Sequence, residues 1–122
     1  MHELNATQGL LELALEQARA AGAARVTDLY LVVGELSTMA PAAVRHYLDV
    51  LSPGTPAEGA TLHVREVSAE LACRACGRRR AAAAPDPGCP GCGSRGSLVA
   101  AGHEFYLEAI DVATDSVASA RG

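Results

Sequence analysis

The first part of the chain repeats apolar residues with the period of a helix. Four apolar residues of the segment 5–21 stand at positions i, i+3, i+4 and i+7: Leu11, Ala14, Leu15 and Ala18. This spacing predicts a helix with one buried face. Asn5 and Gln8 have the spacing of a capping box, so we expect the helix to begin near Asn5. Gly22 follows the last periodic residue and predicts the end of the helix.

Three further segments alternate with a period of two, which is typical of half-buried strands. They are residues 26–34, 61–67 and 104–112, and residues 1–4 are a candidate for a short additional strand. In the last of the three, the alternation places Leu107 on one face of the strand. It places Tyr106, Ile110 and Val112 on the other face.

A second helix is predicted between the first two strands. Pro41 is a favoured residue in a first helical turn, and Pro53 and Gly54 end the helical pattern. The expected buried stripe of this helix consists of Ala40, Val44, Tyr47, Leu48 and Leu51.

Residues 69–101 differ in composition, because they hold all four cysteines, three prolines and few large apolar residues. We interpret them as a separate, loop-rich unit inserted before the last strand. The predicted fold is therefore α+β, with two helices packed on one face of a short mixed or antiparallel sheet. The two helices and this sheet form a discontinuous domain of residues 1–68 and 102–122. Strands 61–67 and 104–112 are expected to run antiparallel as the legs of the insertion.

Composition and charge narrow the range of functions that the chain is expected to have. The chain has 122 residues, few aromatic side chains and a formal net charge of -4. A small domain with so few large core side chains often needs a metal ion or a disulfide. The acidic balance gives no whole-chain sign of nucleic-acid binding. With no secretory signal and no apolar stretch long enough for a bilayer, we expect a cytoplasmic protein that crosses no membrane. The small, polar tail 113–122 is expected to be disordered.

The four cysteines follow the pattern Cys73-x2-Cys76-x12-Cys89-x2-Cys92, and a glycine follows each pair. Two intervening residues let both sulfur atoms of a pair reach one ion, and glycine permits a positive φ in the turn. Four thiolates in two such turns form a closed tetrahedral site, which is the structural form of zinc. Iron, as in rubredoxin, suits the same ligand set. Disulfides or a redox-active pair explain two glycine-followed pairs less well.

Arginines are concentrated in the same unit. Residues 69–101 hold five arginines against Glu70 and Asp86, which gives a formal charge of +3. The run Arg78–Arg80 could contact phosphate, so a zinc-ribbon nucleic-acid or regulatory module is the alternative function. No aromatic residue is interleaved for base stacking, and a zinc ion with four thiolates adds about -2. We therefore favour a loop whose arginines balance the thiolate charge.

The N-terminal residues Met1, His2 and Glu3 form a second candidate ligand set. The terminal amine and the His2 imidazole are nitrogen donors on either side of the His2 amide, and a metal can displace the amide proton. The Glu3 amide or carboxylate can complete the set. Planar nitrogen donors suit Ni(II) or Cu(II) rather than tetrahedral zinc. On chemistry alone, an incidental histidine is the commoner case, and the other histidines lack metal-ligand spacing.

Several motifs occur together in one order: MHE, LLELALEQA, GELS before a proline-started helix, LSPGTPAEGATLHV, two CxxCG pairs and GHEFYLEAIDV. Over about residues 1–112, this set resembles the HypA/HybF family of nickel metallochaperones. The resemblance implies a small nickel-binding α/β domain with an inserted zinc ribbon, residues 69–101. It also implies a protein that is not an enzyme and that serves the maturation of [NiFe]-hydrogenases and, in some organisms, of urease.

The resemblance also implies ligands and partners. Nickel is expected at Met1 (amine), His2 (imidazole and amide) and Glu3, as transferred cargo. Structural zinc is expected at the four cysteines: Cys73, Cys76, Cys89 and Cys92. The implied partners are a nickel-handling GTPase and the hydrogenase large subunit, with the chain a monomer or a homodimer. Glu35 of the GELS motif lies at a strand end, where we favour a structural role over a part in nickel binding.

Overall fold

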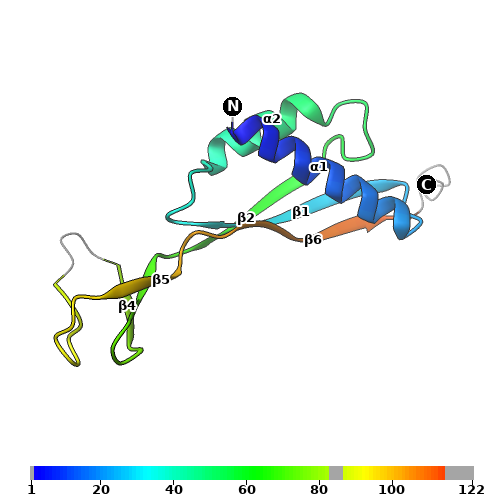
Figure 1. The fold of residues 1–122 in the computed structure, drawn as a ribbon. Coiled ribbons are helices and arrows are strands. Elements are labelled where there is room, and N and C mark those ends of the chain that lie inside the picture. The colour runs from blue at the N-terminus through cyan, green and yellow to red at the C-terminus, as the bar shows by residue number, and fades with distance from the viewer. Residues whose placement is uncertain (1, 83–86, 115–122) are drawn as a thin grey trace.

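The computed structural model describes residues 2–82 and 87–114 (Figure 1). Within these residues, the elements in chain order are α1 (His2–Ala20), β1 (Arg25–Gly34), α2 (Pro41–Leu51), β2 (Thr61–Val67), β3 (Glu70–Cys73), β4 (Arg79–Ala81), β5 (Ser97–Ala101) and β6 (Phe105–Ala113). Both helices cover one face of the sheet β2-β1-β6, and the sheet β4-β3-β5 extends from one end of it. The α+β fold class is confirmed. Neither helix in this part of the chain has the length and apolar character needed to cross a bilayer.

β1 is the central strand of the first sheet, with β2 parallel to it on one side and β6 antiparallel on the other. α2 lies in the crossover from β1 to β2, which a parallel pair requires. β2 and β6 therefore run in opposite directions, as predicted, but they lie on opposite sides of β1 and do not pair. In the second sheet, β3 is central and antiparallel to both β4 and β5.

The hydrophobic core lies between the helices and the first sheet. Its buried members are all aliphatic: Leu11, Ala14, Ala18, Val26, Leu29, Leu31, Val33, Val44, Leu48, Ala57 and Leu62. The predicted stripe of α1 is confirmed, with Leu15 partly buried beside it. In α2 the stripe is confirmed at Val44, Leu48 and Leu51. Tyr47 is only half-buried and is not part of the core, and Ala40 is exposed because it precedes the helix.

α1 begins at His2, about one turn earlier than predicted, so the start near Asn5 and the strand over residues 1–4 are wrong. The physical reason is Thr7, which is fully buried and extends the core-facing side of α1 toward the N-terminus. Its Oγ1 donates a hydrogen bond to the carbonyl of Glu3 at 2.5 Å, which satisfies the buried hydroxyl. Asn5 is instead an exposed residue of the first turn.

The predicted end of α1 is confirmed. Gly22 has a φ of 72°, and its N–H donates to the carbonyl of Arg19 at 3.0 Å. The N–H of Ala23 donates to the carbonyl of Ala18 at 2.9 Å. This pair of bonds is a Schellman motif, which satisfies the last carbonyls of the helix.

The structure confirms that Leu107 and Tyr106 lie on opposite faces of β6, but the grouping of Tyr106 with Ile110 and Val112 is wrong. Leu107, Ile110 and Val112 all pack against the core, whereas Tyr106 is exposed. The pairing register between β6 and β1 skips Glu108, which forms a β-bulge. Because one extra residue reverses the alternation of side chains, a strict period of two cannot place both halves of this strand correctly.

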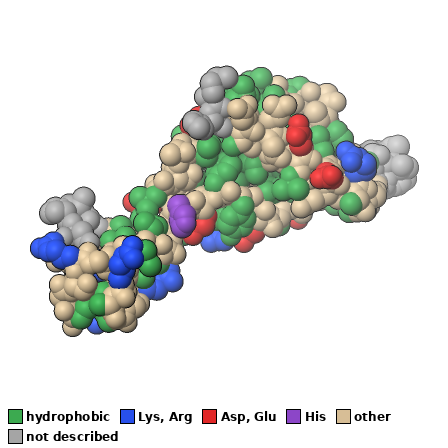
Figure 2. All heavy atoms as spheres, viewed as in Figure 1, with side chains coloured by type: hydrophobic (Ala, Val, Ile, Leu, Met, Phe, Trp, Pro, Cys, Tyr) green, Lys and Arg blue, Asp and Glu red, His purple; other side chains and the backbone are tan. Residues whose placement is uncertain are grey.

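The inserted unit is loop-rich as predicted, but it also contains three short strands that the sequence did not predict: β3, β4 and β5. Residues 69–101 are called the ribbon from here on. Figure 2 shows arginine side chains around the end of the molecule that holds the ribbon. The part of the tail beyond Thr114 lies outside the described residues.

The two sheets meet at a joint of three segments, residues 34–36, 67–70 and 101–104. The backbones approach so closely that a Cβ on Gly34 would lie 2.1 Å from the carbonyl carbon of Gly102. The Glu35 carboxylate accepts a hydrogen bond from the N–H of Ala69 at 2.7 Å. This contact supports the structural role expected for Glu35.

Candidate metal centre

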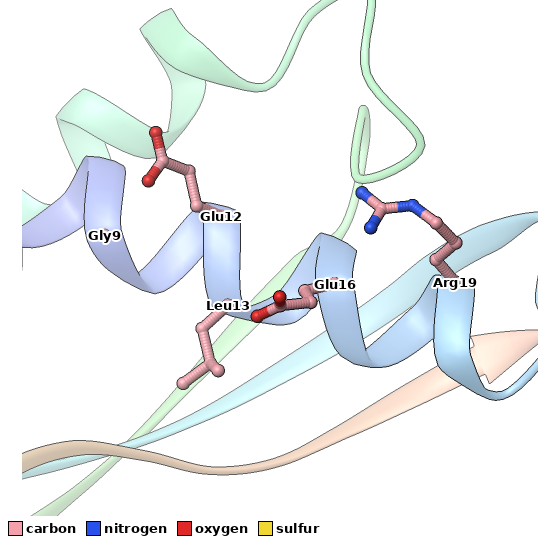
Figure 3. Close-up of a pocket in the computed structure, with 5 residues that line it drawn as sticks. All are labelled: Gly9, Glu12, Leu13, Glu16 and Arg19. Carbon is pink, nitrogen blue, oxygen red and sulfur yellow. The ribbon is translucent and has the colours of Figure 1, made fainter.

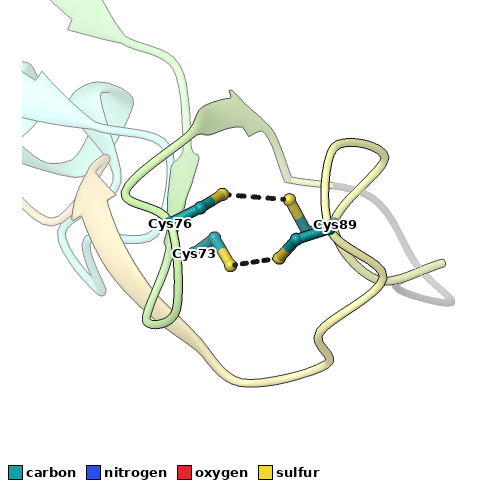
Figure 4. A group of neighbouring side chains, drawn as sticks. Cys73, Cys76 and Cys89 are labelled. Atoms are coloured by element: carbon teal, nitrogen blue, oxygen red, sulfur yellow. Dashed lines mark hydrogen bonds between the residues drawn. The ribbon is translucent and has the colours of Figure 1, made fainter.

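The structure brings the four cysteines together at the far end of the ribbon. Their sulfur atoms all lie within 4.8 Å of one another. The Sγ atoms of Cys73 and Cys92 are 3.6 Å apart, and those of Cys76 and Cys89 are also 3.6 Å apart (Figure 4). A disulfide would bring two sulfur atoms to about 2.0 Å, so all four thiols are free. Ligands of one tetrahedral zinc ion would be separated by about 3.8 Å, which these distances fit.

Two turns of the same design hold the cysteines, and we call them the first knuckle (Cys73–Arg78) and the second knuckle (Cys89–Ser94). In each, the glycine after the second cysteine donates its N–H to the carbonyl of the first cysteine at 2.8 Å. Gly77 has a φ of 80° and Gly93 a φ of 79°, so the predicted need for glycine is confirmed at both positions. Each turn thereby directs its two sulfur atoms to the same side.

Backbone N–H groups in the knuckles point at sulfur. The N–H of Ala75 lies 3.4 Å from Cys73 Sγ, and the N–H of Gly91 lies 3.4 Å from Cys89 Sγ. Hydrogen bonds from the backbone N–H groups of Cys76 and Ala75 lower the pKa of Cys73 to about 6. Each knuckle therefore stabilises one thiolate before any cation arrives.

The pKa values of the two thiols in the second knuckle are shifted in opposite directions. Hydrogen bonds from the backbone N–H groups of Cys92 and Gly91 lower the pKa of Cys89. The N–H of Ser94 favours the thiolate of Cys92, but contact with the Cys73 sulfur, burial and the remaining sulfurs outweigh it and raise the pKa of Cys92 to about 11. Four thiolates at this spacing repel one another, so the site can be fully deprotonated only around a cation.

The arrangement can hold one divalent ion with four sulfur ligands and leaves no position for water or substrate. It fits the structural zinc predicted from the cysteine spacing. Iron would accept the same geometry, because the ligand set is identical. Cys73 and Cys89 are buried, which gives the cluster a protected inner side.

The structure describes less of the N-terminal ligand set. Glu3 lies in the first turn of α1 and is half-buried. Met1 and the side chain of His2 lie outside the described residues. The nickel ligands predicted at these three residues therefore remain a prediction.

The other three histidines lie on separate segments and do not form a group. His46 on α2 is exposed and contacts Tyr47 edge-on, and His103 is exposed beside the joint. His63 on β2 pairs with Asp28 at 2.8 Å. Among the residues that the structure describes, the four cysteines are the one group of His, Cys, Asp and Glu side chains with metal-binding spacing.

A polar network on the sheet face opposite the helices was not found by sequence reasoning. The ring of His63 stacks on Tyr30 at 4.6 Å, and the Tyr30 hydroxyl donates to Asp111 at 2.6 Å. The hydrogen bond to Asp111 raises the pKa of Tyr30 to about 12. These residues belong to β1, β2 and β6, so only the strand order could have revealed the network. It ties three strands together and contains no nucleophile–base pair.

A shallow hollow lies along the solvent side of α1 (Figure 3). It has a volume of about 360 Å³ and is lined by Gly9, Glu12, Leu13, Glu16 and Arg19. The four side chains drawn there splay apart instead of converging on one point. The hollow therefore has no arrangement of groups suited to catalysis.

Known proteins share the sequence pattern and the overall fold. The sequence model of the family described as "Hydrogenase/urease nickel incorporation, metallochaperone, hypA" matches residues 1–112. The hydrogenase maturation factor HypA of Caldanaerobacter subterraneus subsp. tengcongensis is 39% identical over 113 residues, which cover 92% of this chain and 99% of that protein. HypA of Acidithiobacillus ferrooxidans is 37% identical over 112 residues, with 92% and 99% covered.

Solved structures show the same fold. A solution structure of HypA protein superposes with a TM-score of 0.77 at 22% identity and covers 94% of this chain and 98% of its own. The solution structure of the Ni metallochaperone HypA from Helicobacter pylori gives a TM-score of 0.66 at 20% identity, with 93% and 98% covered. Taken with the sequence match over residues 1–112, these findings show that the chain belongs to the HypA family of nickel metallochaperones for hydrogenase maturation.

Proposed function

We propose that the chain binds Ni(II) at Met1, His2 and Glu3 and delivers it to [NiFe]-hydrogenase, and to urease where that enzyme is present. The observation that carries this proposal is the closed cysteine cluster. It is the one metal-binding group among the described residues, and a site with four protein ligands suits a resident ion rather than cargo. Nickel therefore needs other ligands, and the family match includes the N-terminal residues.

The start of α1 at His2 suits this ligand set. The N–H groups of a first helical turn have no carbonyl partner inside the helix and point along its axis toward the N-terminus. The amide nitrogens of His2 and Glu3 can therefore exchange a proton for a metal without breaking a hydrogen bond of α1. With the Met1 amine and the His2 imidazole, they supply the nitrogen plane that Ni(II) prefers.

Transfer follows from the position of the site at a chain terminus. A square-planar ion leaves both faces of the plane open, so ligands of a docked partner can approach along one face. The nickel then moves by stepwise exchange of ligands, with no covalent chemistry by the chain. Protonation of the amine, the imidazole and the amides competes with nickel, so affinity should fall as the pH falls.

The four cysteines would hold structural zinc. Zinc would fix the two knuckles relative to each other and supply order that the small ribbon core cannot provide alone. We assign residues 69–101 to this zinc-ribbon domain. Residues 1–68 and 102–122 form the nickel-binding domain.

The proposed partners are a nickel-handling GTPase and the hydrogenase large subunit, which would meet the chain, a monomer or a homodimer, in the cytoplasm. Nucleic acid is not a proposed partner. Two of the three arginines in the run 78–80 have protein partners: Arg79 donates twice to Glu70, at 2.7 and 3.0 Å, and Arg80 donates to Ser97 at 2.9 Å. Because protein groups hold Arg79 and Arg80, these two side chains are less available to phosphate, which weakens the alternative of a phosphate-binding ribbon.

The test is a calorimetric titration of Ni(II) into untagged, zinc-loaded protein. His2→Ala removes the imidazole, and one residue added before Met1 moves the terminal amine away from the His2 amide. We expect both changes to abolish tight nickel binding and to leave the circular dichroism spectrum unchanged.

His46→Ala is the matched control, because it removes an exposed imidazole from the same domain. It should bind nickel like the unaltered chain. Equal nickel binding by the chain, His2→Ala and the extended chain would refute the terminal site.

A further inference from the structure

The two knuckles share one hydrogen-bonding design but differ at three matched positions: Arg74 and Pro90, Ala75 and Gly91, and Arg78 and Ser94. The residue whose carbonyl accepts the N–H of the first cysteine is Arg78 in the first knuckle, at 2.9 Å, and Ser94 in the second, at 2.8 Å. The residue that points its N–H at sulfur is Ala75 in the first knuckle and Gly91 in the second. The first knuckle thus carries a cation where the second lacks one, and the second lacks a Cβ where the first has one.

The missing Cβ at Gly91 leaves room for a neighbouring side chain, whereas the backbone at Gly91 does not itself call for glycine. Gly91 does not have a positive φ, whereas Gly77 and Gly93 do. A Cβ built on Gly91 would lie 3.0 Å from Nη1 of Arg78 and 3.3 Å from its Cδ. The same Cβ would lie 3.7 Å from Cys89 Sγ. The Arg78 side chain therefore crosses from the first knuckle and occupies the place beside the second one, on the same side as the Cys89 sulfur.

Within the described part of the ribbon, no carboxylate competes for this guanidinium. Glu70 is the one acidic residue there, and it binds Arg79. Arginine keeps its charge at every accessible pH, and four thiolates around a divalent ion leave about -2 on the site. A guanidinium lying over one knuckle therefore faces concentrated negative charge.

We infer that Arg78 is a positioning residue of the metal centre, a cation that Gly91 admits over the second knuckle to screen and cover the thiolate of Cys89. This role rests on the proposed zinc occupancy. A zinc-bound thiolate reacts with an electrophile through a lone pair on sulfur. The sulfur then binds zinc less well, and the ion is released. A cation beside the sulfur reduces its nucleophilicity, and the side chain limits access to it.

The experiment compares zinc-loaded full chains of Arg78→Gln and the unaltered protein. Iodoacetamide is added together with a chromophoric zinc chelator, which reports the rate of zinc release. We expect release to be about three times faster in Arg78→Gln, consistent with the middle of the range for an exposed charge pair. Mass spectrometry after partial reaction should place the additional alkylation on Cys89.

Two variants separate charge from other effects. Arg65→Gln removes an exposed arginine from the first sheet and should react like the unaltered chain. Arg78→Lys keeps the positive charge and should react more slowly than Arg78→Gln. An unchanged rate in Arg78→Gln, equal acceleration in Arg65→Gln, or additional alkylation shared equally by all four cysteines would overturn the inference.

The zinc content before reaction distinguishes this inference from the proposed function. Absence of zinc from the unaltered chain would refute the zinc site itself. One zinc per chain with identical release rates in all variants would leave the zinc site in place and refute the role of Arg78.

Discussion

Gly34 and Gly9 show how differently two glycines can matter to one fold. At Gly34, a Cβ would lie 2.1 Å from the backbone of Gly102, a distance that no side-chain movement can relieve. Gly9 lies in the middle of α1, where a Cβ would have nothing within 4 Å. The first glycine permits the close approach at the joint, and the second only weakens a helix.

Alanine substitution should therefore act in opposite directions at these positions. Gly34→Ala is expected to lower the free energy of unfolding by about 3 kcal/mol or more, because two backbones must separate. Gly9→Ala is expected to raise it by about 0.5–1 kcal/mol through helix propensity. Urea denaturation of the zinc-loaded protein measures both. A mild effect at Gly34 would contradict the tight joint.

Sequence reasoning succeeded for residues whose role is set by their nearest neighbours. Gly22, Gly77 and Gly93 were predicted because each reverses the chain locally, and the structure gives all three a positive φ. Gly34 and Gly102 could not be predicted, because their close approach joins segments far apart in the sequence. The role of Gly91 could not be predicted for the same reason, since its neighbour Arg78 belongs to the other knuckle.

At the scale of elements, long segments with a clear period were predicted well and short ones were not. β2 has the predicted bounds, and β1 and α2 differ from theirs by no more than a residue or two. The strands of the ribbon were missed because β3, β4 and β5 are short and lack alternation of apolar and polar residues. β6 was placed correctly but its faces were not, because a bulge depends on the partner strand.

The pair of Asp28 on β1 and His63 on β2 gives a prediction at this scale. The hydrogen bond from His63, together with one from Thr27, holds the pKa of Asp28 below its ordinary value. A lowered pKa in the folded state means that the pair stabilises the fold fully above the ordinary pKa of 3.8. That contribution disappears as the pH falls through the lowered pKa.

NMR titration of the Asp28 carboxyl carbon tests the assignment. His63→Ala should raise the midpoint toward the ordinary value, whereas His46→Ala should leave it unchanged. A titration of Asp28 in the unaltered chain at its ordinary pKa would contradict the pairing.

At the scale of the whole molecule, the two sheets depend on different sources of stability. The first sheet packs against two helices around an aliphatic core. In the described part of the ribbon, the buried apolar residues are two alanines and two of the metal-binding cysteines: Ala69, Cys73, Cys89 and Ala101. So little apolar surface cannot offset the entropy of ordering the ribbon, which makes the metal its main stabilising element.

Removal of zinc should consequently unfold the ribbon alone. After chelation, or in Cys73→Ser, amide NMR signals of residues 69–101 should move to the positions of an unfolded chain, while those of α1 and β1 stay dispersed. Atomic emission spectroscopy should show the accompanying loss of zinc. A ribbon that keeps its dispersed signals without metal would contradict this account, and full zinc content in Cys73→Ser would refute the four-thiolate site.

The fold class could be predicted from the periodicity of apolar residues, and the cysteine site from the regular spacing of the two cysteine pairs. The position of the ribbon at one end of the first sheet did not, since the joint depends on contacts between three separate segments. The nickel ligands remain a prediction. Chemistry and family resemblance point to Met1, His2 and Glu3, and the described residues include only part of that set.

The joint also bears on how such a chain can be rearranged. A Cβ on Gly102 would lie 2.7 Å from the Cα of Ala69, so the ribbon leaves and re-enters the first domain at almost the same point. Closing the gap after excision of residues 70–101 requires only a short turn, with a small loop-closure cost. We therefore expect the ribbon to be removable as one segment. A deletion could leave the helices and the first sheet intact, and a different metal module could be grafted in its place.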